Sequence, residues 1–277
     1  MILALLLLLQ DAQAFRDKGA KVVEAGGVVV SIDAGDVSLW TEADFKALAA
    51  LPSLRTLSFS KGLTDASLEW LSGAPALETL QTNLSGMTDD GTKALAKIRT
   101  LKALKLFHPA KAFTGTGLAH LADLPELRSL TVAGSYAFGD AGMEAVAKLV
   151  RLQEFRTWHA GQTIEGVRHL RGLTSLRSLT LGQVLAYKPP TTLSDETLAV
   201  LADMPSLEIL QLEEARLTPE ALRRLKALPK LKTLTLRGIE IPEADLEGLR
   251  RELSHAKIDW TPPTPAYQKR IRALFGP

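Results

Sequence analysis

The chain has 277 residues, of which 46% are hydrophobic and 23% are charged. This balance is typical of a globular protein and excludes an intrinsically disordered chain. A formal net charge of +2 does not by itself indicate a nucleic-acid partner. Cysteine is absent, which excludes disulfide bonds, a thiolate nucleophile and a cysteine zinc site.

The first residues have the pattern of an export signal. An apolar run from Ile2 to Leu9 is followed by Ala12-Gln13-Ala14, which is similar to an A-x-A cleavage site. The run is shorter than the roughly 20 apolar residues that span a bilayer, and no Lys or Arg precedes it. We expect residues 1–14 to be a signal peptide and the protein to be exported, either periplasmic or secreted. The alternative is a buried cap helix in a cytoplasmic protein.

Residues 15–50 are expected to form an N-terminal cap. Phe15 to Glu24 is predicted as a helix that ends at Gly26-Gly27. Val28 to Ile32 is rich in β-branched residues, and a helical stripe resumes at Phe45. Such a cap is needed because a stack of repeats would otherwise expose a slice of its apolar core.

Residues 51–260 repeat one pattern, Leu-x-x-Leu-x-Leu followed by a turn and a helix. The best-formed copy has Leu228, Leu231, Leu234 and Leu236. Apart from the stretched sixth repeat, the interval between copies falls within roughly 20–29 residues, which is the length of a coil made of one strand and one helix. One coil cannot bury its own apolar face, so the coils must stack. The central position of the pattern is occupied by Leu57, Leu80, Leu104, Leu130, Phe155, Leu179, Leu210 and Leu234.

The predicted helices begin with a hydroxyl residue and an acid. We expect the hydroxyl to cap the helix and the acid to face the positive end of the helix dipole. A proline at the first helical position fits because its missing N–H is not needed there. These starts are Thr64-Asp65, Thr88-Asp89, Ser194-Asp195 and Thr218-Pro219-Glu220.

Three of these segments carry a family resemblance. Leu63 to Leu68, Phe138 to Met143 and Leu193 to Leu198 resemble the LTDAGL segment of the cysteine-containing class of leucine-rich repeats. That class is familiar from F-box substrate receptors and from exported bacterial proteins, planctomycete ones especially. The resemblance covers roughly residues 28–260.

The resemblance implies an α/β leucine-rich-repeat solenoid, a horseshoe of about eight repeats plus caps, with a parallel concave sheet and convex helices. It also implies protein or peptide binding without catalysis. The chain departs from the class in having no cysteine, and nothing like an F-box precedes the repeats. We therefore do not expect a ubiquitin-ligase adaptor.

Alternate residues of each strand are expected to line the concave face, because successive side chains of a strand point to opposite sides. The inner row is Ser58, Gln81, Lys105, Thr131, Arg156, Thr180, Gln211 and Thr235, and the next row is Ser60, Asn83, Phe107, Ala133, Trp158, Gly182, Glu213 and Arg237. Exposed aromatic residues beside cations are typical of binding hot spots. The alternative is that Phe107 and Trp158 fold under neighbouring loops as part of the core.

Two repeats are stretched, by His108 to Gly117 and by Gly182 to Thr192. Insertions in repeat proteins emerge as loops at one edge, which is often the binding edge, although a tolerated surface insertion is equally simple. The candidate ligand-binding residues are Lys105, Phe107, His108, Arg156, Trp158, His159, Tyr187, Glu213 and Glu214. We expect the first three and the next three to form one patch, with the two glutamates further along.

Residues 261–277 are read as a stiff proline-rich linker and a basic tail. The tail, Lys269 to Phe275, is either an amphipathic membrane-surface helix or a terminal segment that is disordered or packed on the last coil. We expect no membrane contact and a monomer.

No catalytic motif is present: the sequence lacks H-E-x-x-H, G-x-S-x-G and a P-loop. We therefore expect neither an enzyme nor a cofactor. A metal site is not expected either, since His108 and His159 would supply two ligands without a carboxylate. The favoured function is a non-enzymatic protein- or peptide-binding module. The alternatives are a structural spacer of an exported matrix, without a discrete ligand, and a carbohydrate or cell-wall binder.

Overall fold

The computed structural model describes residues 12–183 and 192–275. The apolar run from Ile2 to Leu9 and the candidate residue Tyr187 therefore lie outside the described residues. The chain divides into two compact units, residues 1–131 and 132–277, and the boundary falls inside strand β6 (Ser129–Ala133).

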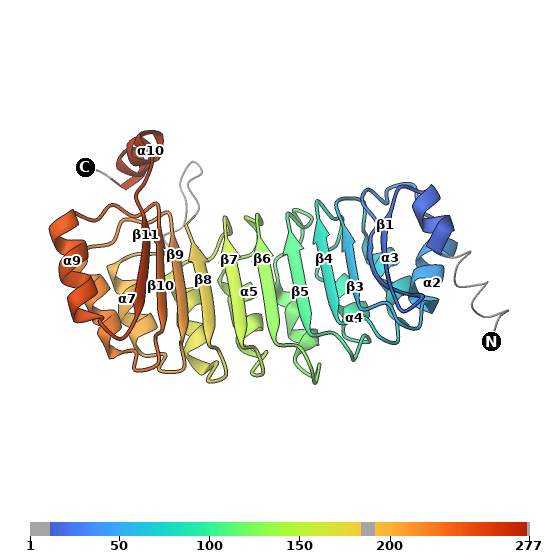
Figure 1. The fold of residues 1–277 in the computed structure, drawn as a ribbon, viewed down its shortest axis with the longest axis horizontal. Coiled ribbons are helices and arrows are strands. Elements are labelled where there is room, and N and C mark those ends of the chain that lie inside the picture. Colours follow the sequence, from blue (N-terminus) through green and yellow to red (C-terminus); the bar gives the residue numbers. More distant parts are fainter. Residues whose placement is uncertain (1–11, 184–191, 276–277) are drawn as a thin grey trace. The chain divides into compact units, whose positions relative to one another are not determined.

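In the first unit, parallel strands alternate with helices (Figure 1). Strand β2 pairs with β3, β3 with β4 and β4 with β5, all in parallel. The elements are β1 (Lys21–Ala25), β2 (Val28–Asp33), α2 (Glu42–Ala50), β3 (Thr56–Phe59), α3 (Asp65–Leu71), β4 (Thr79–Asn83), α4 (Gly91–Leu95), β5 (Ala103–Phe107) and the 3-10 helix η1 (Thr116–Leu121).

The second unit continues the same alternation. Strands β7, β8, β9, β10 and β11 pair in parallel in chain order. The elements are α5 (Asp140–Ala147), β7 (Glu154–Trp158), α6 (Ile164–His169), the 3-10 helix η2 (Leu170–Gly172), β8 (Ser178–Gly182), α7 (Asp195–Ala202), β9 (Ile209–Glu213), α8 (Pro219–Arg223), the 3-10 helix η3 (Arg224–Ala227), β10 (Thr233–Arg237), α9 (Glu243–Glu252), β11 (Lys257–Thr261) and α10 (Pro265–Phe275).

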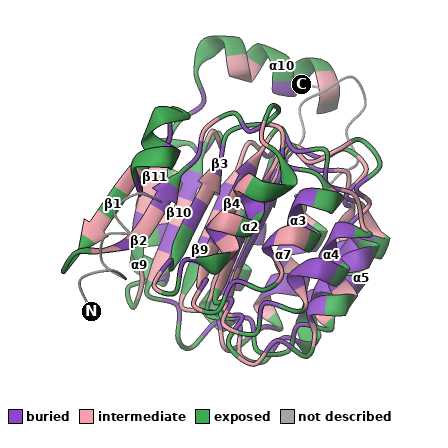
Figure 2. Ribbon diagram, turned by 90° about the vertical axis from the view of Figure 1, so that its right-hand side faces the viewer, coloured by how far each residue is buried: buried purple, intermediate pink, exposed green. Residues whose placement is uncertain are grey.

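The leucine pattern sets the register of the strands in both units. Leu57 lies opposite Leu80, and Leu80 opposite Leu104, while Phe155, Leu179, Leu210, Leu234 and Ile258 form the corresponding row of the second unit. All eight predicted central positions, Leu57, Leu80, Leu104, Leu130, Phe155, Leu179, Leu210 and Leu234, are 0% exposed. Figure 2 shows the resulting alternation of buried and partly exposed residues along the strands. Each buried leucine contributes about 1.5–3 kcal/mol of hydrophobic stabilisation.

The prediction of a helix from Phe15 to Glu24 is wrong for most of its length. Residues 12–17 are helical, but Lys21–Ala25 is strand β1, antiparallel to β2. Gly19 has a φ of +87°, which ends the helix, and Gly26-Gly27 have φ of +60° and +80°. Two successive positive φ values make the tight turn of a β-hairpin, where glycine is favoured. The two glycines therefore connect strands, and they do not cap a helix.

Aromatic side chains join this hairpin region to the first repeats. Phe15 stacks on Trp40 with ring centroids 5.8 Å apart, and Trp40 contacts Phe45 at 6.0 Å. Phe45 in turn lies 6.1 Å from Phe59 on β3 and 5.8 Å from Trp70 on α3. Aromatic pairs at such distances add to the stabilisation from burial. They cover the apolar end of the first coil, as a cap must.

The helix starts are built largely as expected, with one addition. Thr64 accepts a hydrogen bond from Ser67 N at 3.3 Å, and Pro219 is the first residue of α8. For α4 the prediction is off by two residues, because its N-cap is Asp90 and not Thr88. The addition is that each aspartate side chain also accepts hydrogen bonds from a threonine of the next coil.

We call these contacts the helix-start row: the pairs Asp65–Thr88, Asp89–Thr114, Asp140–Thr163 and Asp195–Thr218. In each pair the carboxylate accepts one bond from the threonine backbone N–H and one from its hydroxyl, at 2.6–3.0 Å. Charge-assisted hydrogen bonds of this length are among the stronger ones in proteins. The row therefore ties consecutive coils together.

The stretched third repeat is partly core. His108 to Gly117 was expected to be a surface loop, yet Phe113 within it is 0% exposed. The sixth repeat's insertion is described only at its ends, where the Gln183 side chain accepts hydrogen bonds from Thr192 N at 2.9 Å and Leu193 N at 3.2 Å. No helix among the described residues is both long and apolar enough to cross a membrane.

Candidate functional site

Alternate strand residues share one face in each unit, as predicted, although Thr131, Ala133 and Thr180 of these rows are buried, at 3%, 1% and 6% exposure. In the second unit Arg156, Thr180, Gln211 and Thr235 lie side by side in register. Ser58, Gln81 and Lys105 do so in the first unit. Arg156 is exposed and forms an ion pair with Glu154 of its own strand at 2.6 Å. The face in the second unit therefore is polar, with exposure falling to 6% at Thr180.

The strand ends carry the bulkier groups. Trp158 ends β7, Gly182 ends β8, Glu213 ends β9 and Arg237 ends β10, and the last three lie in register. Trp158 is partly exposed, so it is neither fully buried in the core nor fully open to solvent. Gly182 makes room for it, since a Cβ on Gly182 would lie 2.5 Å from the Trp158 Cβ. A larger residue at position 182 would therefore displace the indole.

The residue after the strand end takes a left-handed backbone conformation in several coils. Among the described residues the non-glycine examples are Leu84, His108, His159 and Glu214, with φ between +44° and +65°. Glycines, Gly134 and Gly238, take the same place after β6 and β10. For a residue with a side chain this conformation costs roughly 1–2 kcal/mol, and such strain is often found at functional sites.

Backbone bonds fix this conformation. Glu214 N donates to Arg237 O at 2.8 Å, Gly238 N to Thr261 O at 2.9 Å and Leu84 N to Phe107 O at 3.1 Å. Each bond runs from one coil to the end of the next strand. The side chains at these positions are therefore held on a rigid support beside the strand ends.

Two of the residues with this strained backbone conformation contact each other through their side chains. His159 Nε2 and Glu214 Oε2 are 3.2 Å apart and form a hydrogen bond across the end of β8. This bond raises the pKa of His159 above its usual value; burial opposes the rise, and the negative charges of Glu214 and Glu213 add to it. Burial alone would raise the pKa of Glu214, but His159, the nearby Tyr267 hydroxyl and the charge of Arg270 outweigh it and lower that pKa. Protonated His159 and ionised Glu214 are therefore both favoured.

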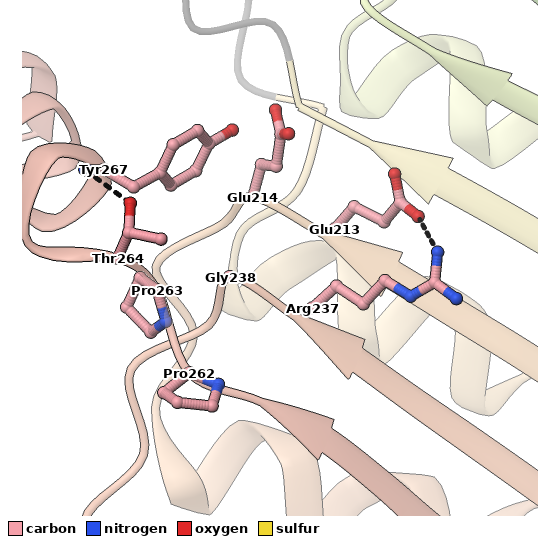
Figure 3. A pocket seen from close by; sticks show the side chains of 8 residues that line it. All are labelled: Glu213, Glu214, Arg237, Gly238, Pro262, Pro263, Thr264 and Tyr267. Atoms are coloured by element: carbon pink, nitrogen blue, oxygen red, sulfur yellow. Dashed lines mark hydrogen bonds and ion pairs between the residues drawn. The ribbon is translucent and has the colours of Figure 1, made fainter.

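A cavity of about 350 Å³ adjoins this pair. Figure 3 shows it between the ends of β9 and β10 and the segment that leads into α10. Its lining residues are Glu213, Glu214, Arg237, Gly238, Pro262, Pro263, Thr264 and Tyr267. Arg237 Nη1 lies 3.5 Å from Glu213 Oε1, so a cation and carboxylates face the same space.

Tyr267 closes one side of the cavity. Its hydroxyl is buried and points toward the Glu214 carboxylate (Figure 3), near enough to lower the pKa of that carboxyl, although within the described residues it lies outside the geometry of a full hydrogen bond. Burial and the neighbouring carboxylate both raise the pKa of Tyr267, so the group stays protonated. Unpaired buried hydroxyls are uncommon in native proteins.

We call Trp158, His159, Glu213, Glu214, Arg237 and Gly238 together the strand-end ledge.

The predicted site residues are divided between the two units. Lys105, Phe107 and His108 belong to β5 and its end in the first unit; Phe107 is partly exposed, and His108 Nδ1 bonds Asn83 Oδ1 at 2.9 Å. Arg156, Trp158, His159, Glu213 and Glu214 belong to the second unit. There the glutamates were expected to lie further along, whereas Glu214 contacts His159 directly. A single patch from both groups stays a prediction.

The sequence did not point to Tyr267 or to the lining role of Arg237. A signal was present, because Tyr267, Ile271 and Leu274 have the spacing of one helix face after Pro265. The residues were read as a tail, and a linker of prolines gave no reason to place them beside the strand ends. No group of three or more His, Asp or Glu in the described part of the chain is arranged to hold a metal ion.

The fold has solved counterparts. An internalin from Listeria monocytogenes superposes on 97% of this chain and 79% of its own with a TM-score of 0.53, at 15% sequence identity. The chain folds as a leucine-rich-repeat solenoid. A leucine-rich-repeat protein from Leptospira interrogans covers 77% of this chain and 62% of its own, at 18% identity and a TM-score of 0.44.

One curated relative shares the repeats at the level of sequence. Human F-box/LRR-repeat protein 12 is 34% identical over 140 residues, which are 46% of this chain and 40% of that protein. The chain thus matches less than half the length of this relative. No family profile matches the chain. The comparisons show a leucine-rich-repeat fold, and they do not test the cysteine-containing class or the planctomycete type.

Proposed function

We propose that this leucine-rich-repeat chain is a non-enzymatic module that binds a protein or peptide, and that the second unit binds it on the strand-end ledge. The observation that carries the proposal is the His159–Glu214 pair. Both residues hold a strained backbone conformation that glycine would adopt without cost, as Gly134 and Gly238 do after other strands. Their side chains therefore have a use that offsets the strain, at the place where repeat proteins commonly bind.

The chemistry of the ledge supports a macromolecular ligand. A partly exposed Trp158 lies beside a charged pair, and aromatic residues next to charges dominate the energy of protein interfaces. Glu213 and Arg237 add one charge of each sign, which can orient a partner as well as hold it. Leucine-rich-repeat proteins are in general protein-interaction modules, which is the coarser ground for the same proposal.

The test is a peptide selection against the whole chain, followed by affinity measurements on Trp158→Ala. We expect the variant to bind selected peptides at least about 30-fold more weakly, which corresponds to about 2 kcal/mol, with a nearly unchanged melting temperature. Glu243→Ala, on the exposed side of α9, is the matched control and should bind normally. Phe107→Ala tests whether the ligand also uses the first unit.

Two outcomes would contradict the proposal. If Trp158→Ala unfolds the chain, the indole is part of the core and the ledge was misinterpreted. If no selected peptide depends on Trp158, the ledge is not the binding surface, as a spacer or a carbohydrate binder would predict.

Export is a separate proposal that rests on the sequence of residues 1–14. Cleavage after Ala14 would make Phe15, which is 3% exposed and stacks on Trp40, the first residue of the mature chain. N-terminal sequencing of protein from its native host should therefore begin at Phe15. An intact Met1 on the folded protein would contradict export.

A further inference from the structure

Helix α10 does not belong to the stack of repeats. It follows Pro262-Pro263 and lies beyond the ends of β10 and β11, away from the layer that contains α7 and α9 (Figure 1). It is largely exposed, with one buried stripe (Figure 2). Ile271 is 7% exposed, and Tyr267 and Leu274 lie on the same face of the helix, whereas Lys269 and Arg270 are exposed.

The helix is seated on the strand-end ledge through its aromatic residue. A Cβ on Gly238 would lie 3.5 Å from Tyr267 Cε1, so the ring packs directly over this glycine. The Tyr267 hydroxyl is buried against Glu214. An aromatic ring thus lies on the ledge at the point where one side chain is missing.

Basic side chains accompany the ring. Arg270, three residues after Tyr267, is close enough to Glu214 for its charge to lower that carboxyl pKa. Arg272 Nη2 forms an ion pair with Glu240 Oε1 at 3.2 Å. The acidic residues on and next to the ledge are therefore matched by an aromatic residue followed by arginines.

The helix leaves the ledge incompletely filled. The cavity of about 350 Å³ lies between Tyr267, Pro262 and the Glu213–Arg237 pair. Trp158 is also left partly exposed, and Arg156 is exposed. A segment longer than α10 would find both more space and further polar partners on this surface.

We infer that the strand-end ledge recognises a peptide segment in which an aromatic residue is followed by a basic one, and that α10 occupies the ledge as the chain's own tethered competitor for that segment. The inference deepens the proposed function and rests on it. The tether is short, since only Pro262 to Thr264 separate β11 from α10. A short tether raises the effective concentration of the attached segment to about the millimolar range, so a free partner must compete with it.

The first experiment measures docking of α10 in the whole chain without any ligand. A helix of this length is marginal in water by itself, so its amides are protected only while it is docked. We expect amide hydrogen exchange in residues 265–275 to accelerate at least about 10-fold in Tyr267→Ala and in Ile271→Ala. Lys269→Ala, on the exposed side of the same helix, is the control and should leave exchange unchanged.

The second experiment adds a fluorescent peptide of residues 264–275 to the same full-length chains. We expect it to bind Tyr267→Ala at least about 10-fold more tightly than it binds the wild type, because the competing helix is released. A peptide in which the tyrosine is replaced by alanine should not bind. Glu214→Gln in the Tyr267→Ala background should weaken binding of the normal peptide several-fold.

Equal affinity of the peptide for wild type and Tyr267→Ala, or binding to neither, would overturn the inference. So would rapid exchange of α10 in the wild type. Either result leaves the proposed function standing if selected peptides still depend on Trp158. Conversely, a peptide of residues 264–275 that binds as expected, while no foreign peptide depends on Trp158, would confine the ledge to its own tail and remove the proposed function.

Discussion

The helix-start row and the strand-end ledge are each built from equivalent positions of several coils, but the residue types repeat in the first and vary in the second. The helix-start row repeats the same two residue types, Asp and Thr, with the same pair of hydrogen bonds. After the strand ends the residue changes from coil to coil, from leucine to histidine, glycine and glutamate. Stacking of similar coils requires the same contact in each coil, which the Asp–Thr pairs provide. The residues after the strand ends share one backbone conformation but differ in side chain, so each coil presents a different surface there. The comparison separates residues that hold the solenoid together from residues that are available for recognition.

The largest loss of stability should come from the core that supports both rows. Leu130 is 0% exposed in β6, so Leu130→Ala should lower the free energy of unfolding by about 2–5 kcal/mol through lost burial and a cavity. Denaturant unfolding measures it. A loss below about 0.5 kcal/mol would mean that the leucine register is wrong.

The helix-start row should come next. Asp89 accepts hydrogen bonds from Thr114 N, the Thr114 hydroxyl, Gly115 N and Gly117 N at 2.6–3.1 Å. Asp89→Ala leaves these donors unpaired and should cost about 2–4 kcal/mol in the same unfolding experiment.

Its neighbour Asp90 is a matched control for Asp89. Asp90 has an exposed side chain that pairs with Lys93 and makes no capping hydrogen bond, so Asp90→Ala should leave the free energy of unfolding nearly unchanged. Similar losses for both variants would show that the row does not tie coils together.

At the strand ends we expect a smaller effect of the opposite sign. Leu84 has a φ of +44° and is 56% exposed, so burial of its side chain offsets little of the strain. Leu84→Gly should raise the free energy of unfolding by about 0.5–1 kcal/mol, and Leu84→Ala, which keeps the strain, should not. Glu214→Gly removes the same kind of strain but also the bond to His159, and it should gain less than Leu84→Gly. A loss at Leu84→Gly would mean that the backbone strain is not relieved.

The smallest effect is a dependence on pH. The raised pKa of His159 stabilises the fold below its ordinary value of 6.5, and this contribution is lost as the pH rises through the folded value. The lowered pKa of Glu214 stabilises the fold above its ordinary value of 4.5, and this contribution is lost as the pH falls through the folded value. The pair therefore stabilises most between pH 4.5 and 6.5.

Melting temperatures of wild type and His159→Gln should differ by about 1–3 °C within that window and converge at pH 8.5, as expected for a partly exposed pair. In the described part of the chain, the charged and titratable groups that face the pair are Glu213, Arg237, Tyr267 and Arg270, and they are unchanged in the variant. A difference that stays constant with pH would show that the pair does not titrate as described.

The regular part of the fold was predictable from the sequence because a repeat applies one rule many times. Leu57 and Leu210 were placed in the core by their spacing alone, and both are fully buried. The hairpin was missed because a single pair of glycines ends a helix and turns a hairpin equally well. Val22 and Val23 before that pair were the evidence for a strand, since β-branched residues favour it.

The site was predictable only where it depends on alternation. The exposed positions of Arg156 and Trp158 follow from the period of two along β7. The contact of His159 with Glu214 does not, because it depends on a left-handed turn after each of two strands that are 55 residues apart. Tyr267 was missed for a related reason: its partners are set by the direction in which the chain leaves β11, which no repeat specifies.

The hairpin at the start of the sheet has a consequence for self-association. A stack of parallel strands offers each end as a template on which another copy can add its own coil. Strand β1 is the first strand of the sheet, runs against β2 and shifts register at a bulge between Val23 and Glu24. A coil that runs in the direction of β2 would have to pair with β1 antiparallel, unlike the parallel pairing between the coils, and Lys21 and Glu24 place charges along this edge. End-to-end growth into filaments is therefore disfavoured at this strand.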